Sequence, residues 1–357
     1  MPNNKTIGWV IGSILVLGGG GYALAKYNTN SMAHVLYQRV TGEQSNQLAS
    51  ISLKTETTST EEKINTDEIT KMLKQQNFMG EYAVLKDGKL SENIKVGKNA
   101  SENKYYQVAD LENAVTAAAI LKLVDQGKLR LDTPVNQYYS SLGVSSDVTI
   151  QSLLEMTSGL GNNSTPASQL SNVLSLNISN AISMQSETYS YQEINYVLLE
   201  GIIAQVADSS YQEYIKKNFF KPNDLEDVKF VSSVDDQQLA PPYNGTTKVS
   251  DETLAQEMNS QMGKNQIMAT PDGFLKLIQI LIKDYGDNAH FVTSSQHFTG
   301  QLIKQGDMYY GSGGIVGYRA SVAISTDGQR GIVLMSNDSN GQENLTTLVK
   351  DTYKKLK

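Results

Sequence analysis

Asp110 and Asn113 lie three residues apart where an apolar helix is expected to begin, so their side chains would share one helix face. A helix is predicted over about 111–126, after a short strand over 105–108, because apolar residues recur at helical spacing and cover most of its surface. A carboxylate at a helix N-terminus is stabilised as the anion and is a poor nucleophile. Asn113 has no basic lone pair that could accept a proton. The structural interpretation of Asp110 is therefore that of a helix N-cap.

The segment 105–135 resembles the active-site helix of the serine β-lactamase and penicillin-binding-protein superfamily, in its class C-like esterase and carboxypeptidase branch. Three blocks match the family pattern in register, namely Thr116-Ala-Ala-Ala-Ile-Leu121, Gly127-Lys-Leu129 and Leu131-Asp-Thr-Pro-Val135. In that family a serine attacks a carbonyl group and a lysine one helical turn later accepts its proton. The register places Asp110 at the serine position and Asn113 at the lysine position. The resemblance thus implies an active-site frame with a degenerate Ser-x-x-Lys motif.

A literal Ser-x-x-Lys spacing occurs once near this helix, at Ser101-Glu-Asn-Lys104. It precedes the strand over 105–108 and does not stand at the helix start. We therefore expect no nucleophile there.

The second family motif, Tyr-x-Asn, stands just before an apolar helix. The stretch Tyr189-Ser-Tyr-Gln-Glu-Ile-Asn-Tyr196 resembles it when Asn195 and Tyr196 are aligned. The resemblance then gives Tyr191 the tyrosine position, where the phenol relays a proton, and Glu193 the asparagine position. The alternative is that Tyr191 and Tyr196 only pack, and packing is the favoured interpretation for Tyr196.

The third family motif, Lys/His-x-Gly, lies on the strand that lines the pocket, and Tyr310-Gly-Ser-Gly-Gly-Ile315 resembles it. Ser312 would replace the basic residue, while Gly313 and Gly314 would let a substrate backbone approach closely. The resemblance also implies that the N–H groups of Ile315 and Asp110 form a carbonyl cradle. A glycine-rich bend before a hairpin is the structural alternative.

These substitutions change the charge of the expected pocket. The family pocket is positive and suits a substrate carboxylate, whereas Asp110 and Glu193 bring two negative charges, and Asn113 and Ser312 bring none. A carboxylate-terminated peptide would be repelled, and a cation such as the ammonium of a D-alanyl ester on teichoic acid would be attracted. The two carboxylates could also do acid–base work or bind a metal at a suitable distance.

The resemblance and these substitutions together predict an exported cell-envelope pseudoenzyme that resembles penicillin-binding proteins. It would bind wall polymer, either peptidoglycan or D-alanylated teichoic acid, or regulate an active relative. The alternative is an active serine-type hydrolase, a D-alanyl esterase, carboxypeptidase or β-lactamase-like enzyme, with a non-standard site around Tyr191.

The composition excludes several other classes of function. The net charge of −7 gives no electrostatic basis for nucleic-acid binding, and the absence of cysteine excludes disulfides and thiol catalysis. His34, His290 and His297 show no metal-ligand spacing, so we expect no metal and no cofactor.

The first 65 residues indicate export. Residues 1–26 contain an apolar run from Ile7 to Ala25 that ends in Ala-Leu-Ala, which suits either a cleaved signal peptide or a membrane anchor. Residues 27–65 are rich in polar residues and predict a solvated stalk. We expect a secreted or membrane-anchored protein on the surface of a Gram-positive cell.

The remaining residues, 66–357, predict one β-lactamase-like domain. The expected order is a helix, strands, a helical insert over about 132–290, strands and a final helix. Turn signals at Asp87-Gly88 and over 326–329 predict hairpins. The fold class is therefore α/β (α+β), with an antiparallel sheet flanked by terminal helices and an inserted helical subdomain.

Overall fold

The computed structural model describes residues 64–98, 100, 104–140, 145–162, 181–183, 188–254, 266–293 and 302–356. Residues 63–357 form one compact unit. The predicted signal peptide or anchor, and nearly all of the predicted stalk, lie outside the described residues, so these boundaries stay predictions. Within the described ranges, no helix combines the length and apolarity that crossing a membrane requires.

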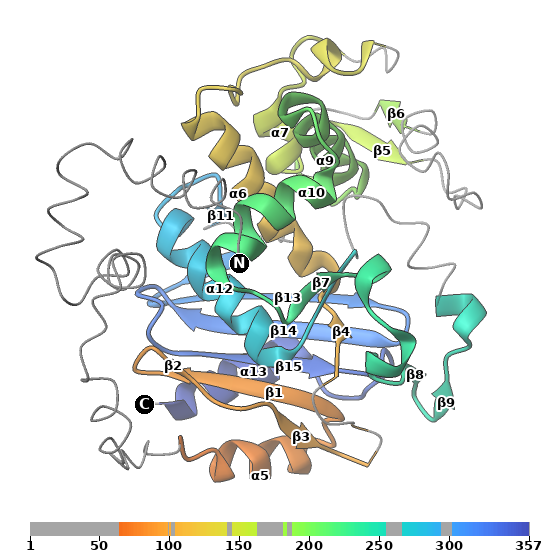
Figure 1. Cartoon of the computed structure of the whole chain (residues 1–357), viewed down its shortest axis with the longest axis vertical. Helices are drawn as coiled ribbons and strands as arrows, with labels where there is room; N and C mark the ends of the chain where they lie inside the picture. Colours follow the sequence, from red (N-terminus) through yellow and green to blue (C-terminus); the bar gives the residue numbers. More distant parts are fainter. Residues whose placement is uncertain are drawn as a thin grey trace, which may run out of the picture. The chain divides into compact units, whose positions relative to one another are not determined.

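A sheet of eight strands, counted over the described residues, forms the centre of this unit (Figure 1). The order is β11-β12-β13-β14-β15-β1-β2, and β3 also pairs with β1. The bounds are β1 (Gly80–Lys86), β2 (Lys89–Leu90), β3 (Ile94–Val96), β11 (Val292–Thr293), β12 (Leu302–Gln305), β13 (Met308–Ile315), β14 (Tyr318–Ser325) and β15 (Gly331–Ser336). Only β11 and β12 run parallel in this described sheet. The predicted antiparallel sheet, which joins both ends of the domain, is confirmed.

Both faces of the sheet are covered. Tyr82 and Val84 of β1 belong to a core formed with α5 (Asp67–Gln75) and α13 (Leu345–Tyr353). Ala83 and Leu85 belong to the larger core on the other face, where α12 (Pro271–Tyr285) packs. Successive side chains of a strand point to opposite faces, so β1 must be apolar at every one of these positions.

The Asp87-Gly88 turn closes a hairpin as predicted. Asp87 has φ 51° and Gly88 has φ 76°, the positive values that a tight two-residue hairpin turn requires. The strand that follows the turn and pairs with the end of β1 is β2, and β3 pairs with the beginning of β1.

The helical part of the unit carries a smaller sheet in the order β4-β10-β7. Its strands are β4 (Tyr106–Gln107), β10 (Ile267–Ala269) and β7 (Val228–Phe230). The other described elements here are η1 (Ala109–Leu111), α6 (Glu112–Asp125), η2 (Val135–Gln137), α7 (Ile150–Leu154), β5 (Leu160–Asn162), β6 (Ala181–Ser183), α9 (Ile194–Ala207), α10 (Tyr211–Ile215), η5 (Lys216–Phe220), η6 (Lys221–Asn223), η7 (Val231–Ser233), η8 (Asp236–Gln238), β8 (Tyr243–Asn244) and β9 (Thr247–Lys248). Strand β4 leads directly into η1 and α6, as the sequence predicts.

Helix α6 is the buried centre of this part. All residues from Glu112 to Leu121 are buried, so the predicted central helix is confirmed. The Glu112 carboxylate is fully buried, and its Oε2 accepts the backbone N–H groups of Gln266 at 2.6 Å and Ile267 at 3.0 Å. Burial raises the pKa of Glu112 to about 7, although these two hydrogen bonds act in the opposite direction.

Glu112 should make stability depend on pH. The folded-state pKa of Glu112 is raised above its usual value. Its contribution to the free energy of unfolding is therefore complete below about pH 4.5 and is lost as the pH rises through about 7. We expect Glu112→Gln, whose carbonyl oxygen can accept the same N–H groups, to gain roughly 3 kcal/mol relative to the wild type across this window. Denaturant melts of both proteins measure the difference. A difference that does not change with pH would contradict this prediction.

Candidate functional site

Asp110 lies in the turn η1, between β4 and α6. The preceding strand is fixed because Tyr106 pairs with Ala269 of β10 and the N–H of Val108 donates to the carbonyl of Ile267 at 3.2 Å. Ala109 has φ 51°, a left-handed conformation that costs a residue with a Cβ about 1–2 kcal/mol. This strained turn brings the Asp110 side chain toward two other segments of the chain.

The Asp110 carboxylate is held from two sides. The hydroxyl of Tyr191 donates to Oδ1 at 2.7 Å, and the N–H of Gly314 donates to Oδ2 at 3.4 Å. Neither η1 nor α6 has a side-chain cap, so the predicted N-cap role is wrong. The carboxylate makes tertiary contacts in place of the local one.

Tyr191 acts as a hydrogen-bond donor here. Burial raises the pKa of its phenol far above the usual value, and the charges of Asp110 and Glu193 raise it further. The phenol therefore keeps its proton at neutral pH and can stabilise the Asp110 anion. Tyr191 thus meets Asp110, while the proton relay implied by the resemblance stays a prediction.

The loop that carries Tyr191 is fixed by Asn195, a residue that the sequence analysis used only to set the alignment. Asn195 Nδ2 donates to the carbonyl of Gln192 at 2.7 Å, and its Oδ1 accepts the Ser158 hydroxyl at 2.5 Å. Its exposure is 1%, and a buried asparagine at the start of an apolar helix was the available signal. Asn195 is a positioning residue for Tyr191.

Three other residues assigned from the sequence have clear positions in the helical part. Tyr196 is fully buried and donates to the carbonyl of Leu154 at 3.2 Å, so the packing interpretation is confirmed. Glu193 is exposed at the N-cap position of α9, where its side chain makes no capping bond. Asn113 is buried in α6, with 1% exposure.

Gly313 lets β13 approach the Asp110 turn. A Cβ on Gly313 would lie 2.6 Å from the Asp110 nitrogen and 3.1 Å from Ala109 Cβ. The space that a side chain at Gly313 would fill is therefore occupied by the Asp110 turn of the chain itself, and not by a substrate backbone as predicted. Gly314 is exposed, and a Cβ there would meet only ordinary contacts, with Arg319 Cγ at 3.5 Å.

Ser312 faces away from Asp110. Its hydroxyl lies 2.7 Å from the Ser321 hydroxyl and 2.6 Å from the Thr346 hydroxyl of α13, on the other face of the sheet. Strand side chains alternate, so a residue next to Gly313 cannot share the face that meets η1. The prediction that Ser312 lines the ligand pocket is therefore wrong, because the face of β13 toward η1 belongs to its neighbour Gly313.

The same one-residue shift applies to the carbonyl cradle. Neighbouring N–H groups of an antiparallel strand point to opposite edges, and the Gly314 N–H points to Asp110. The Ile315 N–H accordingly points toward β14, where Ile315 lies opposite Tyr318, and the Ile315 side chain is buried. Gly314, and not Ile315, presents its amide to Asp110.

A cation that belongs to none of the three family motifs, Arg319, lies beside this strand. Arg319 of β14 pairs with Gly314, and its guanidinium donates to Glu343 Oε1 at 2.7 Å and to the carbonyl of Asp338 at 2.6 Å. Glu343 thus neutralises this charge. Ser101 lies outside the described residues, and Lys104 donates to the Gln237 carbonyl.

A buried helix entered from a short strand, beside the glycine-rich strand of a large antiparallel sheet, defines the serine β-lactamase and penicillin-binding-protein class. The family model described as Beta-lactamase matches residues 66–351, and the chain belongs to this family. The predicted resemblance is confirmed. Of the two residues that form the hydrogen bond at the site, Asp110 and Tyr191, the tyrosine is the one that carries a hydroxyl group.

Similar proteins occur in Bacillus subtilis and Staphylococcus aureus. PbpX of Bacillus subtilis, named as a penicillin-binding protein, is 26% identical over 308 residues, which is 78% of this chain and 77% of PbpX. Protein flp of Staphylococcus aureus is 31% identical over 144 residues, which is 37% of this chain and only 29% of that protein.

Solved structures share the fold. FmtA from Staphylococcus aureus superposes with a TM-score of 0.68 at 18% identity, over 82% of this chain and 87% of FmtA. A D-amino acid amidase from Ochrobactrum anthropi SV3 gives a TM-score of 0.68 at 16% identity, over 81% of this chain and 98% of the amidase. These likenesses support the fold alone.

The contact between β13 and η1 can be tested with two glycines. We expect Gly313→Ala to lower the free energy of unfolding by about 1–3 kcal/mol, because its Cβ would collide with the Asp110 backbone. Gly314→Ala is the matched control, and it should be neutral or stabilising by up to about 1 kcal/mol. Urea denaturation measures both. Equal losses in the two variants would show that Gly313 is not the closer contact.

Proposed function

We propose that this chain is a cell-envelope member of its family that binds a ligand at the family site without hydrolysing it. The observation that carries the proposal is the Asp110 carboxylate, bonded to the Tyr191 hydroxyl and to the Gly314 N–H. An acyl group has no serine to be transferred to at this position. The amide that could polarise a substrate carbonyl faces the carboxylate of the chain itself.

The charge of the site favours a cationic ligand. Asp110 and Glu193 both act on Tyr191, so two carboxylates lie near the same phenol. The nearby Arg319 is compensated by Glu343. These observations support an ammonium-bearing ligand such as a D-alanyl ester of teichoic acid, or another D-alanylated wall component, presented to an exported protein. Regulation of an active relative is compatible with the same site.

The second candidate function is hydrolysis by a non-standard site. It is favoured by the 2.7 Å contact between Tyr191 and Asp110, because a carboxylate beside a hydroxyl is a base beside a nucleophile. The raised pKa of Tyr191 opposes this candidate, since a phenol that holds its proton so firmly is a weak nucleophile. We therefore favour binding.

Covalent labelling separates the two candidates. We expect that a fluorescent penicillin leaves no covalent label on the wild-type protein after denaturation, because residue 110 carries no hydroxyl. The double variant Asp110→Ser/Asn113→Lys should gain the label, since the strained turn and the Gly314 amide remain in place.

Asp110→Ala is the control for this experiment, because it removes the carboxylate without adding a nucleophile. It should stay unlabelled. A labelled wild type would reverse the assignment, and the labelled peptide would identify the reacting hydroxyl.

Ligand charge provides a separate test. We expect a D-alanyl ester with a free ammonium to bind more tightly than its N-acetylated, neutral form. Asp110→Asn should reduce this preference by roughly 1–3 kcal/mol, because it removes one charged partner and keeps the side-chain shape. Glu193→Gln, at an exposed position, should have a smaller effect. Calorimetric titration measures both, and equal affinity for cationic and anionic wall fragments contradicts the proposal.

A further inference from the structure

A concave site lies where α6 and α9 end, beside α10. It is a hollow of about 550 Å³ lined by the residues that directly follow α6, by the end of α9, and by residues of α10, η5 and η6. Its charged lining residues are four lysines and two acidic residues, namely Lys128, Lys216, Lys217, Lys221, Asp208 and Glu213. The hollow is therefore positive, although the chain carries a net charge of −7.

Most of this positive charge has no counter-ion in the described part of the chain. Lys128, Lys217 and Lys221 are exposed and form no ion pair there. The Glu213 carboxylate takes part in the N-terminal cap of α10, where its Oε2 accepts the Ser210 N–H at 3.3 Å. Like charges gathered around one hollow repel each other, and a bound anion would remove that repulsion.

An unusual backbone places two of these lysines. The segment Lys216–Phe220 is a π-helix, a rare form that recurs at functional sites. Lys216 is further held by Phe230, whose ring lies 5.4 Å from its Nζ, and Asn218 Nδ2 donates to the carbonyl of Tyr214 at 2.9 Å. The backbone that carries Lys216 and Lys217 is thus held in place by the surrounding structure.

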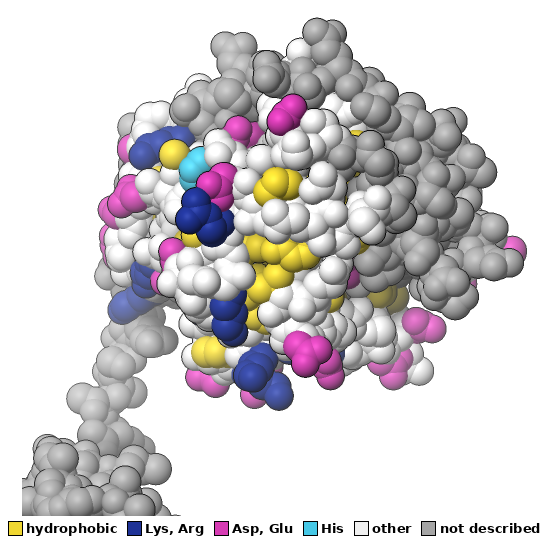
Figure 2. Space-filling model, turned by 90° about the horizontal axis from the view of Figure 1, so that it is seen from above, with side chains coloured by type: hydrophobic (Ala, Val, Ile, Leu, Met, Phe, Trp, Pro, Cys, Tyr) yellow, Lys and Arg dark blue, Asp and Glu magenta, His cyan; other side chains and the backbone are white. Residues whose placement is uncertain are grey.

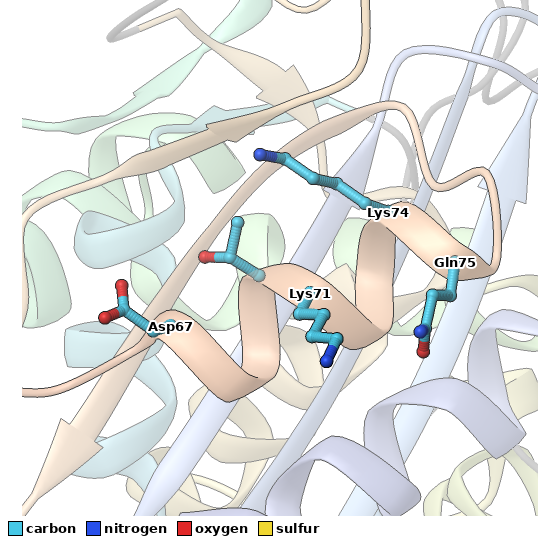
Figure 3. Close-up of a pocket in the computed structure, with 5 residues that line it drawn as sticks. Asp67, Lys71, Lys74 and Gln75 are labelled. Carbon is cyan, nitrogen blue, oxygen red and sulfur yellow. The ribbon is translucent and has the colours of Figure 1, made fainter.

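Two other charged regions among the described residues lack this arrangement. Figure 2 shows Lys and Arg side chains in separate groups, mixed with Asp and Glu, on the face seen from above. A second hollow, of about 440 Å³, lies along α5 and is lined by Asp67, Thr70, Lys71, Lys74 and Gln75. Its labelled side chains diverge, with Lys74 pointing away from Lys71 (Figure 3). Neither region concentrates one sign of charge in a concavity.

We propose that the hollow between α6, α9 and α10 binds the phosphate groups of a soluble polyanion. Lysine ammonium groups act on phosphate as point charges, and all four cations that line the hollow are lysines. Several lysines around one rim suit a ligand with several phosphates. A concave rim also differs from the amphipathic helix face that lies on a membrane surface. The proposal does not depend on the function of the Asp110 site.

The test uses the full chain and short-chain inorganic polyphosphate as the probe, by calorimetry at physiological ionic strength. The variant Lys128→Gln/Lys217→Gln/Lys221→Gln removes three exposed lysines of the hollow. The matched control, Lys89→Gln/Lys98→Gln/Lys248→Gln, removes the same charge at exposed positions outside the lining. We expect saturable binding by the wild type and the control, and binding weaker by on the order of tenfold or more in the hollow variant. Its dependence on salt should also be shallower.

Four outcomes would overturn the proposal: no saturable binding by the wild type, equal weakening in both triple variants, polyglutamate bound as tightly as polyphosphate, or binding only to phosphatidylglycerol vesicles. A structural role for the lysines has its own signature. Helix carbonyl ends attract ammonium groups, and α6 and α9 both end at the hollow. If the lysines served only those ends, the hollow variant would melt earlier and bind polyphosphate unchanged.

Discussion

The close approach of β13 to the Asp110 turn is the constraint on which the site depends. Gly313 must lack a side chain for the turn to reach the strand, and Ala109 must accept a left-handed conformation for the carboxylate to face Tyr191. Backbone strain of this kind persists only where the surroundings enforce it. The chain therefore builds a strained, closely packed turn around Asp110, a residue that has no hydroxyl group.

The fold was predictable because several signals agreed. The blocks that contain Thr116 and Gly127 determined the register of α6, and the Asp87-Gly88 dipeptide determined a hairpin turn. The family assignment followed from the same register. These signals are local, so each could be interpreted without knowing which segments meet.

The errors at the site came from contacts between distant segments. The partners of Asp110 lie 81 and 204 residues further along the chain, and they compete successfully with the local N-cap. The glycine-rich motif carries few side chains that could fix its register. The sequence therefore does not reveal a shift of one residue, although such a shift moves Ser312 to the opposite face of the sheet.

The pairing of β1 with β15 has a consequence for how the molecule forms. Strand β1 belongs to the beginning of the domain and β15 to its end, and their register runs from Gly80 opposite Ser336 to Leu85 opposite Gly331. Such non-local pairing makes folding slow, because a long loop must close before the contact is gained. Until β15 is available, the apolar β1 has an open edge to which other chains can add. Assembly of this domain thus has to outpace aggregation.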